Sequence, residues 1–121
     1  MSQVLVDTSV WRRYLAGGAN VRGLGDLLED DAVLTHPFIV GELVLGGLSV
    51  REEELLGHLP VAPVTAHPEV MEFVKKRRLA RRGIGWVDAH LLTSALTSAA
   101  TLWSLDRSLA SAAKSLGVAF T

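Results

Sequence analysis

The feature that most constrains the fold is a regular alternation of short apolar runs with longer segments of helical periodicity, without hairpin turn signals between them. Short runs of strand character occur at residues 4–6, 32–35, 60–65, 101–105 and 118–120. Helical segments fill the intervals, near residues 10–15, 21–29, 37–46, 50–57, 68–82, 87–99 and 107–116. Because strands that alternate with helices pair in parallel, we predict an α/β fold. It has three layers, α/β/α, with a central, mostly parallel sheet of about five short strands.

Local signals refine two of these segments. Ser49 followed by Glu52 forms a capping box, which predicts the start of the helix at 50–57. Pro60 and Pro63 remove backbone donors, so the strand at 60–65 is expected to be short and at an edge.

Length and composition are those of one ordinary globular domain, predicted to span residues 1–121. Of its 121 residues 49% are hydrophobic and 21% charged, which is close to the average for such domains. No apolar stretch reaches membrane-spanning length and no secretory leader pattern is present. We therefore expect no membrane association and a cytoplasmic location. With no cysteine, only oxygen and imidazole ligands remain for a metal ion.

Charge is segregated along the chain although its formal sum is only -1. The basic residues gather in one segment, at Lys75, Lys76, Arg77, Arg78, Arg81 and Arg82. This basic segment is expected on the second half of the helix at 68–82. It is suited to RNA phosphates, to an acidic partner segment, or to a solvated helix face, and the sequence leaves the three uses open.

Carboxylates stand at the points where an α/β sheet binds its ligands. Asp7 directly follows the first strand and Asp106 the fourth, so both are expected at the carboxyl edge of the sheet. Asp88 begins a helix after a glycine-broken loop, and Glu42 lies in an otherwise apolar helical segment. Asp is also a preferred N-cap, so each aspartate alone is as well explained by capping as by catalysis.

Glu42 is harder to explain structurally, because an unpaired carboxylate is almost never buried. If the four carboxylates converge, neighbouring charges about 4 Å apart repel by roughly 1 to 4 kcal/mol, depending on the effective dielectric. A divalent cation relieves that repulsion, and hard oxygen ligands favour Mg²⁺, with Mn²⁺ as the alternative. Such a site suits hydrolysis of a phosphodiester.

Four blocks carry a resemblance to a known family. They are Val4–Trp11, Gly41–Leu43, Trp86–Leu92 and Leu102–Asp106, and in this order and spacing they resemble the PIN-domain family. The resemblance covers essentially the whole chain and implies cleavage of single-stranded RNA at an acidic Mg²⁺ or Mn²⁺ site. The positions that match its acidic motif are Asp7, Glu42, Asp88 and Asp106. Ser9 and Ser104 match hydroxyl positions near the metal site, and Ala99 and Ala100 stand where relatives often have a glycine.

Compact members of this length resemble VapC-type toxins. The resemblance implies an endoribonuclease that cuts structured RNAs of the translation machinery, forms a homodimer and is inhibited by a cognate antitoxin. Candidate contacts to RNA or antitoxin are Arg13, Lys75, Arg78, Arg82 and Arg107. The tryptophans are interpreted as core or interface residues, with Trp86 the exception to inspect because it precedes Asp88 by two residues.

Alternative functions fit the pattern less well. A haloacid-dehalogenase-like phosphotransferase needs a second aspartate where this chain has Ser9, and a receiver domain needs a lysine at a strand end, whereas Lys114 lies in a predicted helix. A PIN-like module that binds RNA or protein without cleaving remains the alternative of another class.

Overall fold

A three-stranded parallel sheet forms the centre of the computed structural model, which describes residues 3–121. The strands are β1 (Val4–Val6), β2 (Val33–Leu34) and β3 (Thr101–Trp103), in the order β2-β1-β3. Central β1 pairs Val4 with Val33 on one side and with Thr101 on the other. All of β1 and β2 is buried, as expected for a parallel sheet covered on both faces.

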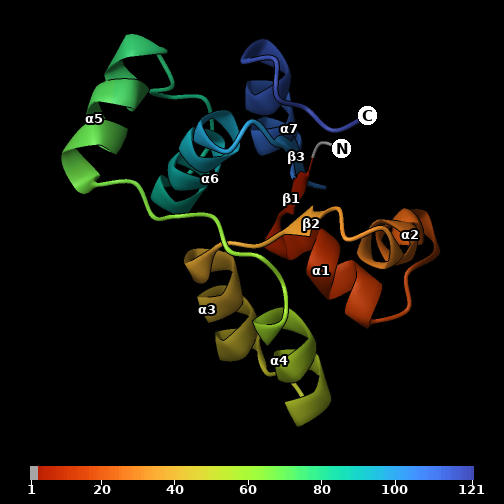
Figure 1. The fold of residues 1–121 in the computed structure, drawn as a ribbon. Coiled ribbons are helices and arrows are strands. Elements are labelled where there is room, and N and C mark those ends of the chain that lie inside the picture. Colours follow the sequence, from red (N-terminus) through yellow and green to blue (C-terminus); the bar gives the residue numbers. More distant parts are fainter. Residues whose placement is uncertain (1–2) are drawn as a thin grey trace.

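Seven α-helices and one 3-10 helix surround the sheet in the described part of the chain. The α-helices are α1 (Thr8–Leu15), α2 (Gly23–Glu29), α3 (Pro37–Gly46), α4 (Val50–Gly57), α5 (His67–Lys76), α6 (Trp86–Thr97) and α7 (Arg107–Ser115), and the 3-10 helix η1 is Ala19–Val21. Figure 1 shows α1, α3 and α4 on one side of the sheet and α6 and α7 on the other. The α/β class, the parallel pairing and the helical layers therefore agree with the sequence-based prediction.

The prediction of about five strands is wrong, because only three form within residues 3–121. The segments expected as strands at 60–65 and 118–120 each add a single bridge, Thr35 with Val61 and Leu102 with Ala119. Beyond β2, which lies at one edge of the sheet, the Thr35 amide donates to the Pro60 carbonyl (2.9 Å) and the Ala62 amide donates to the Thr35 carbonyl (2.8 Å). Pro60 and Pro63 have no N–H to extend this pairing.

Helix α5 ends six residues earlier than predicted, at Lys76 rather than near Arg82. Arg78 has a left-handed φ of 54°, and the amide of Leu79 donates to the Val74 carbonyl at 3.0 Å. This is the hydrogen-bonded C-terminal motif that usually contains glycine, and the buried side chain of Leu79 turns the chain back towards the core. Most of the basic segment thus lies in turns, not on a helix.

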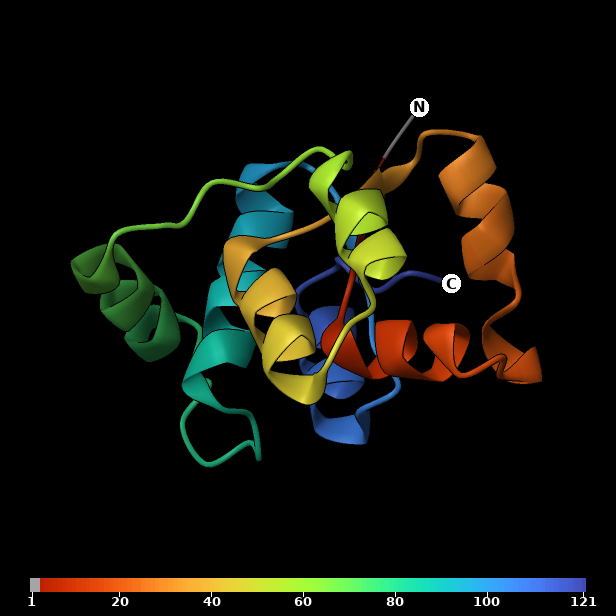
Figure 2. The same cartoon turned by 90° about the horizontal axis from the view of Figure 1, so that it is seen from below.

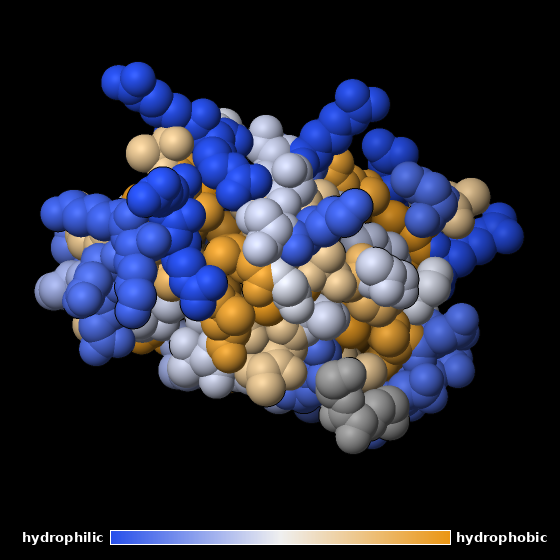
Figure 3. Space-filling view, turned by 90° about the horizontal axis from the view of Figure 1, so that it is seen from above, coloured by the Kyte–Doolittle hydropathy of each residue, from blue (hydrophilic) through white to orange (hydrophobic). Residues whose placement is uncertain are grey.

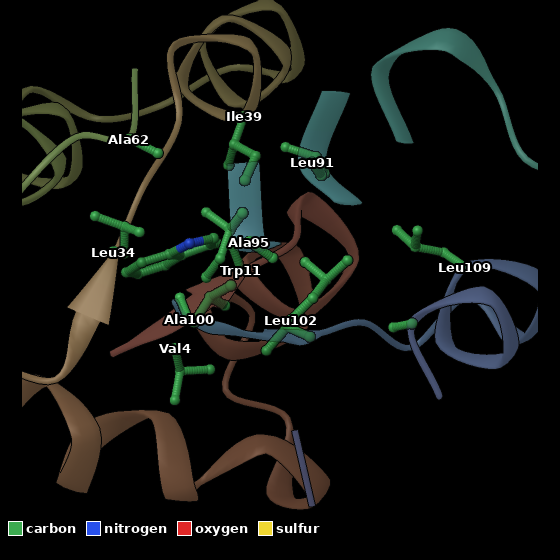
Figure 4. Packing of buried hydrophobic residues seen from close by; sticks show 14 of the residues in the cluster. Val4, Trp11, Leu34, Ile39, Ala62, Leu91, Ala95, Ala100, Leu102 and Leu109 are labelled. Atoms are coloured by element: carbon green, nitrogen blue, oxygen red, sulfur yellow. The ribbon is translucent and has the colours of Figure 1, made fainter. Parts of the chain in front are cut away.

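The core is built around Trp11, whose side chain is fully buried. Figure 4 shows it with Leu34, Ile39 and Ala95, residues of β2, α3 and α6 that belong to the same buried cluster. Helix α6 is apolar nearly all round, which is typical of a helix packed between the sheet and another helix. No helix in residues 3–121 combines the length and apolarity needed to cross a bilayer.

A left-handed turn stands between α6 and β3, at Ala99 (φ 52°). The amides of Ala99 and Ala100 donate to the carbonyls of Leu96 and Ala95, at 3.2 and 2.8 Å. The position calls for glycine, and the alanine is tolerated there at a cost in backbone energy.

Candidate active site

The site is assembled where β1 and β3 end. The two strands pair up to Val6 and Trp103, and the amide of Asp7 donates to the Trp103 carbonyl at 2.9 Å. Asp7 therefore lies beside the residues that lead from β3 to Asp106. In Figure 2, α3, α6 and α7 lie around the end of β1 at which α1 begins.

Asp7 is the best-anchored carboxylate of the site and is only 7% exposed. Its Oδ2 accepts hydrogen bonds from the hydroxyls of Ser9 and Ser104, both at 2.8 Å. Those hydroxyls in turn accept from the amides of Leu105 and Asp106, each at 3.0 Å. The two serines singled out from the sequence thus join the ends of β1 and β3 through Asp7.

Glu42 reaches the same region from the middle of α3, where it is half-buried. Its Oε1 accepts a hydrogen bond of 2.7 Å from the hydroxyl of Thr8, the first residue of α1. No role was predicted for Thr8 from the sequence. Nothing local in the sequence identifies a contact between residues 34 positions apart.

Asp88 and Asp106 are held by backbone amides at helix starts. Asp88, in the first turn of α6, accepts at Oδ2 from the amide of Gly85 at 3.0 Å. Asp106, the exposed N-cap of α7, accepts at Oδ1 from the amide of Leu109 at 2.9 Å. Capping therefore accounts for one oxygen of each. It does not account for Asp7, whose side chain makes no cap bond although it stands at the N-cap of α1.

The four carboxylates share one arrangement: in each, one oxygen is fixed by the protein and the other is left over. The fixed atoms are Asp7 Oδ2, Glu42 Oε1, Asp88 Oδ2 and Asp106 Oδ1. Their second oxygens form no hydrogen bond to any other part of residues 3–121. Each side chain is thus oriented while one oxygen stays available for a ligand.

Asp88 lies within the electrostatic influence of the other three carboxylates. Burial raises the pKa of Asp88, and the negative charges of Asp7, Asp106 and Glu42 raise it further, against the opposing effect of the Gly85 amide. None of the charges acting on Asp88 is positive. A cation would relieve this excess of negative charge.

The donor set fits a hard divalent cation that keeps part of its hydration. All available ligand atoms are carboxylate or hydroxyl oxygens, the type that Mg²⁺ and Mn²⁺ prefer. Within residues 3–121, however, no three acidic or histidine side chains lie close enough together to enclose an ion directly. Mg²⁺ usually retains several waters and binds through one or two carboxylates, which suits this wider spacing.

None of the basic residues selected from the sequence forms a hydrogen bond with the four carboxylates within residues 3–121. Arg107 is exposed and directly follows Asp106, and Arg13 is exposed on α1. Lys75 and Arg78 are exposed at and beyond the end of α5, whereas Arg82 donates to the hydroxyl of Ser115 on α7 at 3.0 Å. Figure 3 shows hydrophilic side chains gathered over the α5 side of the molecule, with hydrophobic surface next to them.

Two histidines, His36 and His90, are buried in the described part of the chain. His36 is fully buried and does cap α3, since its Nδ1 accepts from the Phe38 amide at 3.0 Å. Burial, and secondarily the charge of His90, lower the pKa of His36 to about 4. His90 is also buried, and its pKa is lowered by burial and by His67.

Comparison with known proteins gives one family. The family model described as the PIN domain matches residues 4–115. Ribonuclease VapC32 of Mycobacterium tuberculosis, from strains CDC 1551 / Oshkosh and ATCC 25618 / H37Rv, is 45% identical over 119 residues, covering 96% of this chain and 94% of the relative. Among solved structures, PAE2754 from Pyrobaculum aerophilum aligns with a TM-score of 0.67 at 17% identity, covering 98% of this chain and 88% of that one, which shows a shared fold.

Proposed function

This chain belongs to the PIN domain family, and from that premise we propose that it is a VapC-type toxin, an endoribonuclease that hydrolyses RNA phosphodiester bonds with Mg²⁺ or Mn²⁺. The observation that carries the proposal is the set of four carboxylates with one fixed and one free oxygen each. The similarity to a protein named ribonuclease VapC32 supports the same activity.

The chain's own residues would hold and orient the reacting groups. Asp7, Glu42, Asp88 and Asp106 supply the free oxygens. The Thr8 hydroxyl fixes Glu42, those of Ser9 and Ser104 fix Asp7, and the Ser104 hydroxyl also accepts from the Asp106 amide. A bound Mg²⁺ supplies activation of water and neutralisation of charge on the phosphate. Water would add to phosphorus as the ester P–O bond breaks, and a proton from water would pass to the leaving oxygen. One product strand then ends in a phosphate and the other in a hydroxyl.

The test is cleavage of total bacterial RNA by the purified chain in Mg²⁺, in Mn²⁺ and in EDTA. Cleavage is expected with either ion and not in EDTA. Asp7→Asn and Asp88→Asn, which keep the hydrogen-bonding shape, should lower the rate by about a hundredfold or more. Asp30→Asn, an exposed acid at the end of α2, serves as the control and should cut normally. If both site variants cut as fast as the wild type, the activity belongs to a contaminant and the proposal fails.

We also propose that the toxin is cytoplasmic, forms a homodimer and is inhibited by a cognate antitoxin. Large apolar side chains on α3 and α4 remain exposed and need a covering partner. They are Val44, Leu45, Val50 and Leu55. The dimer is tested by light scattering, and inhibition by adding the small protein encoded next to this chain to the cleavage assay. Persistent cleavage at molar excess would contradict that partner.

A further inference from the structure

One exposed aromatic side chain lies close in sequence to an acidic residue of the site. Trp86 opens α6, two residues before Asp88, and is 40% exposed, whereas Trp11 is fully buried. The indole is braced by two imidazoles, with ring centroids 4.9 Å from His67 and 5.2 Å from His90. It is therefore an oriented flat surface on a rigid helix and not a mobile side chain.

Trp86 also borders an apolar hollow. The hollow has a volume of about 160 Å³ and lies where the turns after α5 meet the start of α6. Its lining includes Ala80, Arg81, Ile84, Gly85, Trp86 and Ala89. Since drug-sized sites measure roughly 300 to 1,000 Å³, this space suits a single planar ring.

The hollow adjoins the reaction site through one residue. Gly85 lines the hollow, and its amide is the donor that fixes Asp88. A ring placed against Trp86 would thus lie beside the residue whose amide fixes Asp88.

Positive charge surrounds the same place. Arg81 lines the hollow, and the exposed residues Lys75, Lys76, Arg77 and Arg78 precede it in the basic segment. Arginine and lysine bind phosphates without reading sequence. An aromatic platform with adjoining cations is the arrangement by which proteins bind unpaired bases of single-stranded nucleic acid.

We propose that Trp86 and this hollow bind one unpaired nucleobase next to the cleaved phosphodiester, while Arg81 contacts the adjoining backbone. The inference rests on the proposed ribonuclease function. It requires that the RNA substrate carry an unpaired base that can unstack from its neighbours. Trp86 is then a positioning residue for the RNA.

The test measures binding in EDTA, so that no cleavage occurs. The probe is a mixed-sequence octamer of 2′-O-methyl RNA, and the reference is an octamer of the same backbone with abasic sugars. Wild-type protein should bind the base-carrying octamer about tenfold more tightly than the abasic one, with quenching of tryptophan fluorescence. Trp86→Leu should bind both octamers equally, at the abasic level. Trp86→Phe should keep part of the preference and lose the quenching.

Met71→Leu is the matched control, because Met71 is an apolar residue with almost the same exposure, 39%, and does not line the hollow. It should behave as the wild type, and circular dichroism checks that each variant is folded. Equal binding of the two octamers by wild type, or a preserved preference in Trp86→Leu, would overturn the subsite. If base-dependent binding persists while the cleavage assay fails, the ribonuclease proposal is wrong and the base-binding site stands.

Discussion

At the scale of single residues, the decisive feature is that the surroundings of Asp88 disfavour its charged form. Burial and three neighbouring carboxylates hold its pKa above the usual aspartate value, so the charged form is less favourable in the folded than in the unfolded chain. The resulting loss of stability is present at neutral pH and disappears as the pH falls through the raised pKa.

We therefore predict that Asp88→Asn raises the melting temperature of the metal-free protein at about pH 7.5, and that the gain vanishes near pH 4. The amide oxygen of asparagine can still accept from Gly85, so only the charge is removed. Added Mg²⁺ should stabilise the wild type more than the variant. Calorimetry in EDTA and in Mg²⁺ measures both effects, with Asp30→Asn as the neutral control. A lower melting temperature for Asp88→Asn would contradict this account.

His36 gives a second prediction, of opposite sign. Its Nδ1 accepts from Phe38, so the proton lies on Nε2, which is buried without an acceptor in residues 3–121. The folded pKa of about 4 lies below the unfolded value of 6.5, so acid favours the unfolded chain. Between about pH 7.5 and pH 5 the wild type should lose about 2 kcal/mol of its free energy of unfolding.

Urea unfolding across this pH range provides the measurement. His36→Gln, which cannot titrate, should show a clearly smaller loss, whatever its absolute stability. His58→Gln removes an exposed histidine that follows α4 and should retain the wild-type loss. Equal acid sensitivity of His36→Gln and wild type would assign the effect to another group.

The site residues illustrate what a sequence discloses at this scale. Asp7 and Asp106 were predictable because they follow strands, and their proximity needs only parallel pairing. The bond from Thr8 to Glu42 was not predictable, since it depends on how α1 packs against α3. Likewise the anchoring of Asp88 was not predictable. It depends on the backbone amide of Gly85, and every residue except proline has such a donor.

At the scale of elements, the loop between α5 and α6 lies against the start of α7. It therefore links the helix that carries Asp88 with the helix that Asp106 caps. Gly83 has a φ of 76°, and a Cβ added there would lie 2.8 Å from the hydroxyl of Ser108 in the first turn of α7. Gly117 has the same φ with open space around it. The two glycines thus share their backbone strain and differ only in the contact.

Gly83→Ala and Gly117→Ala should each lower stability by about 1 to 2 kcal/mol, the cost of a left-handed backbone for alanine. Only Gly83→Ala should also lower RNA cleavage, by about tenfold, because displacing the start of α7 moves Asp106 relative to Asp88. Urea unfolding and initial cleavage rates separate the two effects. Equal cleavage by both variants would show that the contact does not control the site.

Element boundaries were predictable where the signal is local. The capping box of Ser49 and Glu52 correctly marked the start of α4, with both of its hydrogen bonds formed. The end of α5 was missed because Arg78 occupies a left-handed position without glycine. What stops this helix is burial of Leu79, a tertiary effect that periodicity does not reveal.

At the scale of the whole molecule, the net charge of -1 is the sum of separate acidic and basic regions. Asp7 and Asp106 follow β1 and β3, and Asp88 lies in the first turn of α6, whereas most of the basic segment lies in the turns after α5. In the proposed function, the basic segment would bind the RNA backbone while a neighbouring phosphate reaches the carboxylates.

Binding of the 2′-O-methyl octamer should therefore weaken with salt according to the number of phosphates contacted by the basic segment. The double variant Lys75→Gln/Arg78→Gln should make the slope of log K against log salt shallower by about 1.4 if both residues contact phosphates. Arg22→Gln/Arg51→Gln removes two cations from α2 and α4 instead and should leave the slope unchanged. The same change of slope in both double variants would show that the effect comes from overall charge and not from contacts of the basic segment.

The one-fixed, one-free pattern of the carboxylates bears on how such a site responds to ion supply. Their rotamers are restrained before any ion arrives, so little side-chain entropy remains to be lost on binding. We expect occupancy to follow the divalent-ion concentration smoothly, without a conformational threshold. In such a preorganised site, activity would rise gradually with ion concentration, so inhibition would depend on the proposed antitoxin.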